Sequence, residues 1–436
     1  MATGSFGTSV LPPAQYDRAA ADAAVRSAAW HVIPLLAVGY VVSYIDRANI
    51  SFAALTMNRD LGLSATQFGF LAGTFYVGYC LFEVPSNLAL QRYGARRWLA
   101  RIMFTWGLAA AGQAAAQGPV SFGVFRFLTG VCEAGFYPGV MFYLSTWFPI
   151  EVRARAFAWF TVANPMSSVI SGPLSTSLLR LDGVGGISGW RWLLLCEGLP
   201  ACLLGLYTLR ALPDAPRNAR WLSEAQKNAL EQRLTAEQHP EIEQNLWAAL
   251  RHPKVLILSF SFFCAVAGVQ GLTLWLPQML RHHGLSMTAI GWTAAFPYLL
   301  ASIGLIVWSY RMDRTRAFLA NYVGSCALAA CGFALSGAVD SLLGLVAGAS
   351  IALIGMNACR PALFSLLPAF LQGTAAAAGM ALVTSIGNLG GFAGPLVMGR
   401  LKDVTGSFSA GLFGLAGILA LAAVTALSIR GMTQQR

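Results

Sequence analysis

Apolar runs of about 20 residues recur from residue 30 to residue 430, and they limit the possible folds more than any other feature. A helix of this length spans roughly 30 Å, the thickness of a bilayer's hydrocarbon core. Hydrophobic residues make up 56% of the 436 residues and charged residues only 11%, too few for the surface of a soluble protein. The sequence therefore predicts an all-α polytopic membrane protein embedded in a lipid bilayer.

The apolar runs predict twelve transmembrane helices in two six-helix halves. A polar segment at 211–253 separates the halves, and its SEAQKNALEQRL stretch predicts an amphipathic surface helix. The predicted spans are 30–54, 65–89, 98–117, 120–148, 152–179, 190–210, 254–280, 288–310, 317–337, 341–369, 374–399 and 408–430.

The distribution of lysine and arginine predicts the orientation of these spans. With the N-terminus inside, 20 of the 29 basic residues fall in cytoplasmic segments, six fall outside and three lie within spans. This bias is the positive-inside pattern of a membrane protein, and it excludes a nucleic-acid partner as the reason for the net charge of +11. We expect both termini in the cytoplasm of a bacterial cell, with the inner membrane as the location.

The expected organisation follows from the spans and their orientation. It comprises a cytoplasmic N-terminal tail (1–29), a first six-helix bundle (30–210), a cytoplasmic linker (211–253), a second bundle (254–430) and a cytoplasmic tail (431–436). Arginine clusters follow both the second and the eighth span, in YGARR (93–97) and YRMDRTR (310–316). This matching position indicates a two-fold repeat, which is typical of secondary transporters, and a monomer suffices for such a fold.

Catalytic chemistry has no support in the sequence. All eight cysteines lie in apolar runs without C-x-x-C spacing, so disulfide and zinc sites are not expected. We find no nucleophile–base pair, metal cluster or phosphate-binding loop, and we therefore expect neither an enzyme nor a bound cofactor.

Six motifs in order resemble the anion:cation symporter family of the major facilitator superfamily. They are DRANISFA (46–53), EVPSN (83–87) with RYGARRW (92–98), RFLTGVCEAGFYPGVMFYLSTWFP (126–149), GWRWLLLCEGLPA (189–201), LPDAPRNARWLSEAQ (212–226) and GTAAAAGMALVTSIGNLGGFAGP (373–395). The resemblance implies proton-coupled uptake of small organic anions such as sugar acids, tartrate or phthalate.

Two residues of the tenth span depart from this resemblance. The family usually has a tryptophan three residues before the proline that ends the span, where this chain has Ser365. Arg360 also stands in mid-span, where a small or apolar residue is expected. Two interpretations of Arg360 are open: it snorkels or pairs with an acid for stability, or it faces the first half across a central cavity as a second carboxylate contact. The second interpretation favours a dicarboxylate substrate.

Charged residues within spans are the strongest candidates for function, because a charge in the bilayer costs several kcal/mol unless it is paired, hydrated or used. Asp46 and Arg47 are neighbours that point about 100° apart on a helix, so each is expected to find another partner. Arg126 and Glu133 lie two turns apart and share a helix face. We predict that Arg47 and Arg126 bind a carboxylate, while Asp46 and Glu133 take up and release the coupling protons.

Further polar residues are predicted to line the same cavity. In the first half they are Tyr44, Tyr79 and Tyr137, the last placed on the helix face of Glu133. In the second half they are Gln270, Trp275, Thr384 and Asn388, which otherwise serve only to join helices.

A separate group is expected to act in gating or in structural salt bridges near the cytoplasmic ends of the spans. It contains Glu83, Arg96, Arg97, Asp313 and Arg314. Glu197, beside Gly198 and Pro200 in the sixth span, is interpreted as structural.

Two other functions remain open at this point. One is an exporter or antiporter of organic anions, although the fifth span has only SGP (171–173) and lacks a longer glycine series. The other is a transporter-like anion sensor, although the short termini offer no signalling domain.

Overall fold

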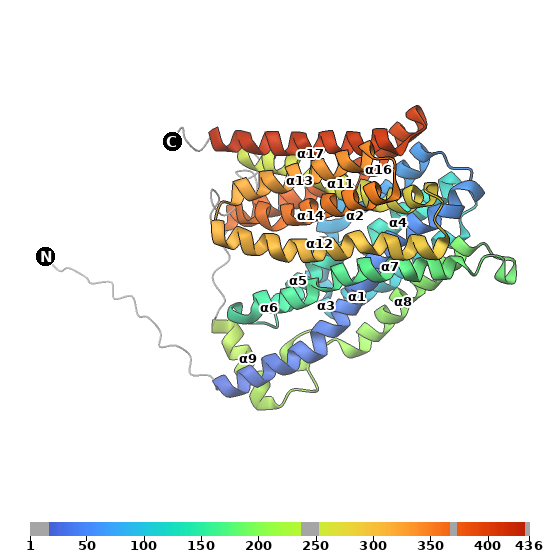
Figure 1. Ribbon diagram of the computed structural model, residues 1–436. Helices are drawn as coiled ribbons and strands as arrows, with labels where there is room; N and C mark the ends of the chain where they lie inside the picture. The colour runs from blue at the N-terminus through green and yellow to red at the C-terminus, as the bar shows by residue number, and fades with distance from the viewer. Residues whose placement is uncertain (1–16, 237–252, 367–372, 432–436) are drawn as a thin grey trace.

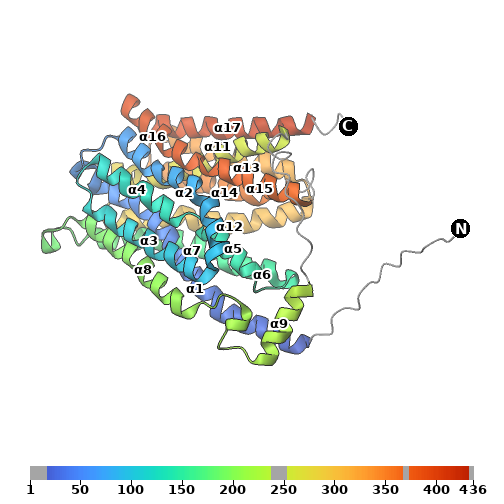
Figure 2. The same ribbon diagram turned by 180° about the vertical axis from the view of Figure 1, so that it is seen from behind.

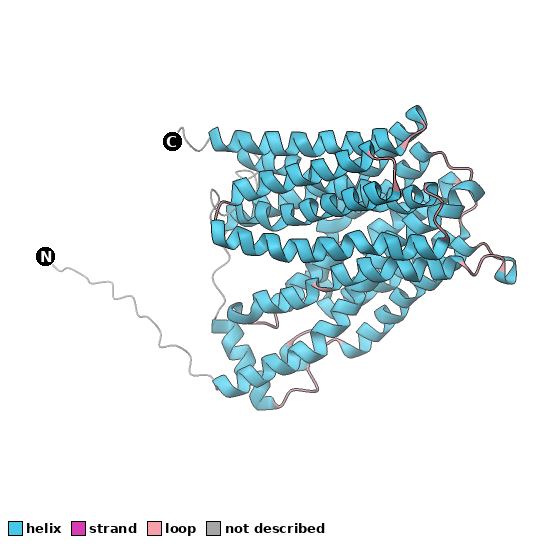
Figure 3. Cartoon of the chain, viewed as in Figure 1, coloured by secondary structure: helices cyan, strands magenta, loops and turns pink. Residues whose placement is uncertain are grey.

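The computed structural model describes residues 17–236, 253–366 and 373–431, and in these ranges the chain forms helices joined by short turns (Figure 3). The helices are α1 (Arg18–Asp60), α2 (Ala65–Tyr93), α3 (Ala95–Gly112), α4 (Pro119–Glu133), α5 (Phe136–Ser145), α6 (Ile150–Thr161), α7 (Ala163–Leu179), α8 (Gly189–Ala211), α9 (Glu224–Ala236), α11 (Pro253–His282), α12 (Met287–Thr315), α13 (Phe318–Ala338), α14 (Leu342–Leu366), α15 (Gly373–Asn388), α16 (Gly390–Thr405) and α17 (Phe408–Gly431).

The predicted all-α membrane fold is confirmed. Nine helical segments among the described residues are long and apolar enough to cross a membrane. The remaining predicted spans correspond to α3, to α4 with α5, and to α6 with α7. The pairs α4/α5 and α6/α7 show that some spans are interrupted, which the apolar pattern alone did not reveal.

The first helix is longer than predicted. It begins at Arg18, so residues 18–29, assigned from the sequence to a tail, are helical and continue directly into the span. Asp17 caps the helix by accepting a hydrogen bond from the Ala20 backbone N–H. The extension packs on α9, where Arg233 donates to Asp22 at 2.8 Å. The predicted surface helix of the linker therefore covers the start of α1, while residues 237–252 of the linker lie outside the described residues.

The two halves contact each other mainly through α2 with α16, α7 with α12 and α1 with α11. At these contacts the backbones approach closely where one of the residues is glycine, which has no side chain. A Cβ at Gly69 would lie 2.3 Å from the Pro395 carbonyl oxygen, and one at Gly172 would lie 2.4 Å from the Gly291 carbonyl oxygen. Backbone from one half thus packs directly on backbone from the other.

These close contacts lie at the end of the molecule opposite the termini. There the Asp403 carboxylate on α16 accepts hydrogen bonds from the Ala65 and Thr66 N–H groups at 3.1 and 2.7 Å, which caps the N-terminus of α2. In Figures 1 and 2, α1, α6 and α8 slope away from the second half toward the end that carries the start of α1, the end of α17 and α9. The two halves are therefore in contact at one end of the molecule and diverge toward its other end.

Candidate functional site

Arg47 and Glu133 form a buried ion pair between α1 and α4. Arg47 Nε and Nη2 donate to the same Glu133 oxygen, Oε1, at 2.8 and 2.6 Å. Ser43, one helical turn before Arg47, donates to that oxygen at 2.5 Å. Glu133 is fully buried, and its Oε2 has no hydrogen-bond partner. The pair compensates both charges, yet leaves one carboxylate oxygen open to a proton or a new donor.

Glu133 occupies the last residue of α4 because the backbone turns directly after it. Ala134 is extended, and Gly135 has a φ of 84°, a conformation that favours glycine. A carboxylate at a helix C-terminus is opposed by the helix dipole, so the guanidinium of Arg47 has a second reason to be there. The prediction that one continuous helix carries Arg126, Glu133 and Tyr137 on one face is therefore wrong.

Tyr137 lies on α5 and belongs to an aromatic cluster. Its ring is 5.5 Å from that of Tyr40 and 6.1 Å from that of Phe160. Tyr40 donates a long hydrogen bond of 3.4 Å to the hydroxyl of Tyr44. Of this cluster, Tyr44 contacts the arginine of the ion pair, since the Arg47 guanidinium carbon lies 5.3 Å from its ring centre.

Asp46 points away from Arg47, as their angular separation on the helix requires. Its Oδ2 accepts a hydrogen bond from Trp106 Nε1 at 2.8 Å, while Oδ1 has no partner. Only 1% of Asp46 is exposed. Glu197 is buried nearby and accepts a hydrogen bond from Ser175 at 2.9 Å. Both acids thus form their hydrogen bonds within the first half, with Trp106 and Ser175, and neither bonds to Arg47.

Arg126 is a buried cation without a carboxylate partner among the described residues. Its Nε donates to the Ala72 carbonyl oxygen at 3.2 Å, and its Nη1 has no hydrogen-bond partner. Only 2% of the residue is exposed. The guanidinium carbons of Arg126 and Arg47 lie 4.8 and 5.2 Å from the centre of the same ring, that of Phe75. A favourable cation–π contact thus holds each arginine, but the charge of Arg126 is not neutralised.

A small cavity between the two halves brings several of these groups together. From the first half its walls include Arg47, Tyr76 and Arg126, and from the second half Gln270 and Thr273. The cavity has a volume of about 10 Å³, room for roughly one water molecule. The halves must therefore move apart at this point before an organic molecule can reach the free Nη1 of Arg126.

Arg47 also contacts two of the predicted tyrosines. Its guanidinium carbon is 5.3 Å from the ring centre of Tyr44 and 5.1 Å from that of Tyr79. Sequence reasoning missed Ser43 and Phe75, although both stand four residues from a predicted site residue on the same helix, Arg47 and Tyr79. It also missed Trp106, which no local pattern links to Asp46.

Arg360 reaches the first half from α14. Its charge interacts with the hydroxyls of Tyr44, Tyr40 and Tyr137, and its guanidinium carbon lies 5.9 Å from the Phe262 ring centre. The side chain is solvent-accessible although it lies in mid-span. Arg360 therefore faces the tyrosine cluster, on the side where the halves diverge.

Three other residues of the second half are predicted to line the cavity, and they lie in different surroundings: Trp275, Thr384 and Asn388. Trp275 is fully buried, donates to the Pro395 carbonyl oxygen at 3.1 Å and packs 5.4 Å from the Phe68 ring. The structure thus places it in the contact between halves rather than on the cavity wall. Thr384 donates to the Met380 carbonyl oxygen of its own helix, and Asn388 is half-buried on α15.

The predicted gating residues are likewise divided. Arg96 makes a salt bridge with Asp214 at 3.4 Å, and its backbone N–H donates to the same carboxylate at 3.0 Å. This contact anchors the first turn of α3 to the segment after α8. Arg97, Asp313 and Arg314 are exposed, and Glu83 is half-buried one turn beyond Tyr79.

Metal chemistry has no obvious place in this arrangement. In the ranges that the structure describes, no three or more His, Cys, Asp or Glu side chains form a group able to hold a metal ion. The functional groups that line the cavity are instead guanidiniums, hydroxyls and an amide. The carboxylate of Glu133 is joined to the cavity through its ion pair with Arg47.

Two helical bundles that meet around a charged, buried cavity define a membrane transporter rather than an enzyme. The sequence model of the Major Facilitator Superfamily matches residues 36–395, and the chain belongs to this family. The predicted family membership is therefore confirmed.

Relatives in this family cover almost the whole chain. A protein of Agrobacterium vitis named "Putative tartrate transporter" is 42% identical over 92% of this chain and 90% of its own length. A quinolone resistance transporter of Acinetobacter baumannii is 39% identical over 91% of this chain and 92% of its own length.

Solved structures share the fold at low sequence identity. An inward-facing, occupied bacterial homologue of the human lysosomal transporter Spinster has a TM-score of 0.74 and 17% identity, with 92% of this chain and 95% of that chain covered. A D-xylose–proton symporter has a TM-score of 0.72 and 17% identity, with 91% and 97% covered.

Proposed function

We propose that this protein takes up a small organic carboxylate together with protons, by alternating access across the bacterial inner membrane. The observation that carries the proposal is Arg126, a buried cation in the cavity between the halves whose Nη1 has no partner. The tartrate-transporter name of a relative that is 42% identical supports a carboxylate substrate. The chain acts as a monomer with both termini in the cytoplasm.

The carboxylate is bound first by Arg126. A buried guanidinium with an open donor position favours an anion that can accept more than one hydrogen bond, and carboxylates do so in a planar geometry. Gln270 and Thr273 supply donors from the other half, so a bound anion would contact both halves at once. Such bridging contacts favour the state in which the halves close around the substrate.

Proton coupling follows from the ion pair of Arg47 and Glu133. When a substrate carboxylate approaches Arg47, it competes with Glu133 for the same guanidinium donors. A buried carboxylate that loses its ion-pair partner has a high free energy, and protonation removes this penalty by neutralising the charge. Substrate binding and protonation of Glu133 therefore favour each other, with Asp46 as a second proton site. Such coupling offsets the membrane potential, which opposes anion entry by about 2.3 kcal/mol per charge for each 100 mV.

Alternating access accounts for the way the halves are joined. The contacts of Gly69 and Gly172 and the cap from Asp403 close the end opposite the termini. With the termini in the cytoplasm, this arrangement is closed to the outside. Uptake then requires these contacts to separate in the opposite phase of the cycle.

Export is the second candidate, because the relative from Acinetobacter baumannii is named for quinolone resistance. Purified protein in proteoliposomes separates the two functions. We expect radiolabelled tartrate, or a related hydroxy acid from a panel, to accumulate when the outside is acidic, and a protonophore to abolish the accumulation. Quinolone movement against a gradient without carboxylate uptake would contradict the proposal.

A further inference from the structure

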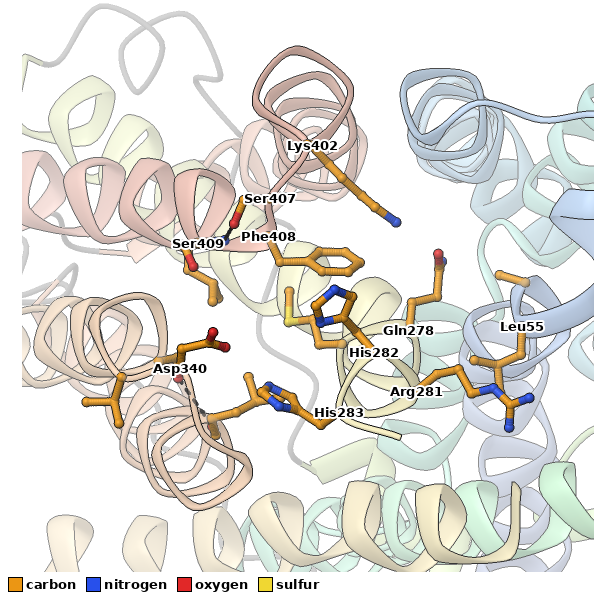
Figure 4. A pocket seen from close by; sticks show the side chains of 17 residues that line it. Leu55, Gln278, Arg281, His282, His283, Asp340, Lys402, Ser407, Phe408 and Ser409 are labelled. Carbon is orange, nitrogen blue, oxygen red and sulfur yellow. Dashed lines mark hydrogen bonds between the residues drawn. The ribbon is translucent and has the colours of Figure 1, made fainter. Parts of the chain in front are cut away.

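A second pocket lies at the closed end of the molecule, mostly in the second half, with Ala54 and Leu55 of α1 in its wall. It has a volume of about 340 Å³, within the usual size range of small-molecule sites. Its walls come from the C-terminal ends of α11 and α16, the start of α17 and the turn after α13 (Figure 4). It is much larger than the central cavity and separate from it, and no part of the transport mechanism above uses it.

The ionisable side chains that line this outer pocket are mostly basic. Arg281 and His282 end α11, His283 follows directly, and Lys402 enters from α16. Asp340, on the far side from Lys402 in Figure 4, is the acid among the lining residues. With neutral imidazoles, Arg281 and Lys402 outweigh Asp340, so the formal charge of the lining is positive. A pocket of this charge favours an anion.

Two of the polar side chains, Lys402 and Gln278, are available to a bound anion. The Lys402 ammonium lies 4.1 Å from the ring centre of Phe408 and 5.3 Å from that of Trp275, so aromatic faces hold it in place. The amide nitrogen Nε2 of Gln278 is buried without a hydrogen-bond partner and belongs to the pocket lining. An unfilled amide donor and a held cation in one pocket are the arrangement expected of a site for an oxygen-bearing anion.

The pocket borders the contact that closes this end of the molecule. Lys402 precedes Asp403, which caps α2 of the other half. Trp275, which contacts Lys402, also packs on Phe68 of α2. An anion in the pocket would therefore lie next to the residues that must separate when the transporter opens to the outside.

We propose that this outer pocket is a binding site for a small carboxylate, which is captured there from the external medium before the central cavity opens. Arg281 and Lys402, from two different helices, are the charged contacts, and Gln278 supplies an amide donor. The pocket raises the concentration of the anion at the entrance. The proposal rests on the proposed function for its substrate class, but binding at the pocket can be measured without transport.

Histidine footprinting tests the proposal at the site itself. The purified full chain in lipid nanodiscs is treated with diethyl pyrocarbonate in the presence of tartrate or of chloride at equal ionic strength, and modified histidines are quantified by mass spectrometry. Tartrate should slow modification of His282 and His283 by about fivefold or more, as expected for a site held by charge-assisted hydrogen bonds. His31, which is exposed at the opposite end, should react at the same rate with either anion.

Three variants decide where the protecting anion is bound. The Arg281→Gln/Lys402→Gln double variant should lose the protection, with His31 reactivity unchanged as evidence of folding. Arg180→Gln removes an exposed cation at the same end of the molecule but outside the pocket, and should keep it. Arg126→Gln weakens the central site and should also keep it.

Several results would overturn the proposal. They are equal reactivity with tartrate and chloride in the wild type, full protection in the double variant, or loss of protection in Arg126→Gln, which would place the anion in the centre. The outcome is distinct from that of the proposed function. Protection without uptake removes only the transport assignment, and uptake without protection removes only the outer site.

Discussion

Arg47 donates two hydrogen bonds to one oxygen of Glu133, while the second oxygen of that carboxylate has no partner. The pair leaves Arg126, which shares the Phe75 ring with Arg47, as the uncompensated cation of the cavity. One arginine is thus linked to a group that can take a proton, and the other is available to an anion. This division of roles is the physical basis of the proposed coupling.

Glu133→Gln should uncouple substrate from protons. The amide still accepts a hydrogen bond from Arg47 but cannot bind and release a proton. We expect substrate exchange across proteoliposome membranes to continue, while accumulation driven by a pH gradient falls to the level without a gradient. Asp46→Asn should have the same effect if it is the second proton site. Accumulation at the wild-type level in both variants would remove the two acids from the coupling mechanism.

Arg126→Lys should weaken binding although the charge is kept. Lysine lacks the planar fork that holds a carboxylate through two donors, so we expect a loss of roughly 1.5–3 kcal/mol, or about 10- to 150-fold in affinity. Arg47→Lys should also weaken binding and disturb its pair with Glu133. Equilibrium binding of labelled substrate measures both effects. Unchanged affinity in both variants would show that the arginines only balance charge in the fold.

Gln270 and Trp275 should respond differently to substitution, because only Gln270 lines the central cavity. Gln270→Ala removes a donor and should raise the KM of uptake several-fold, consistent with a lost hydrogen bond of about 1 kcal/mol. Trp275→Phe removes the bond to the Pro395 carbonyl oxygen and should lower thermal stability while leaving KM near the wild-type value. The reverse pattern would support the sequence-based assignment of Trp275 to substrate binding.

Arg360→Gln should discriminate between substrates with one and two carboxylates. Arg360 faces the tyrosine cluster from the second half, so it can contact the far end of an anion whose first carboxylate is held by the first half. Competition by matched mono- and dicarboxylates should show a selective loss of dicarboxylate affinity. Equal losses for both classes would leave Arg360 without a role in recognising a second carboxylate.

Gly69→Val should shift the protein toward the state in which the closed end is open. A side chain at this position would collide with the Pro395 backbone across the contact between halves. Pulsed electron paramagnetic resonance between labels on the α1–α2 and α11–α12 turns should report longer distances. The labels are attached through unnatural amino acids, because eight native cysteines would otherwise compete. Gly417→Val, at a helical glycine with open space around it, is the matched control and should not change the distances.

The fold could be predicted because each span must satisfy its own backbone in the membrane, so apolar length alone locates helices. Interruptions were not predictable in this way. The break after Glu133 depends on one glycine in a left-handed conformation, and glycine is too common in membrane helices to mark it.

The site could be predicted only in part. Charges within spans, such as Arg47 and Glu133, could be recognised as functional candidates because a charge in the bilayer has a high free-energy cost. The hydrogen-bond partner of each buried acid depended on tertiary contacts. Asp46, for example, accepts a hydrogen bond from Trp106, which lies 60 residues away in the sequence. Trp275 and Gln270 have similar positions in the sequence pattern, and only the packing of α11 on α16 separates the buried one from the one at the cavity.

Proton movement caused by the substrate itself tests the central claim most directly. Wild-type protein is reconstituted in liposomes that contain the pH indicator pyranine, without an imposed gradient, and a transported carboxylate is added outside. The account predicts acidification of the interior in the wild type and none in Glu133→Gln, although the variant still exchanges substrate. Carboxylate entry without acidification in the wild type, or the same acidification in Glu133→Gln, would contradict it.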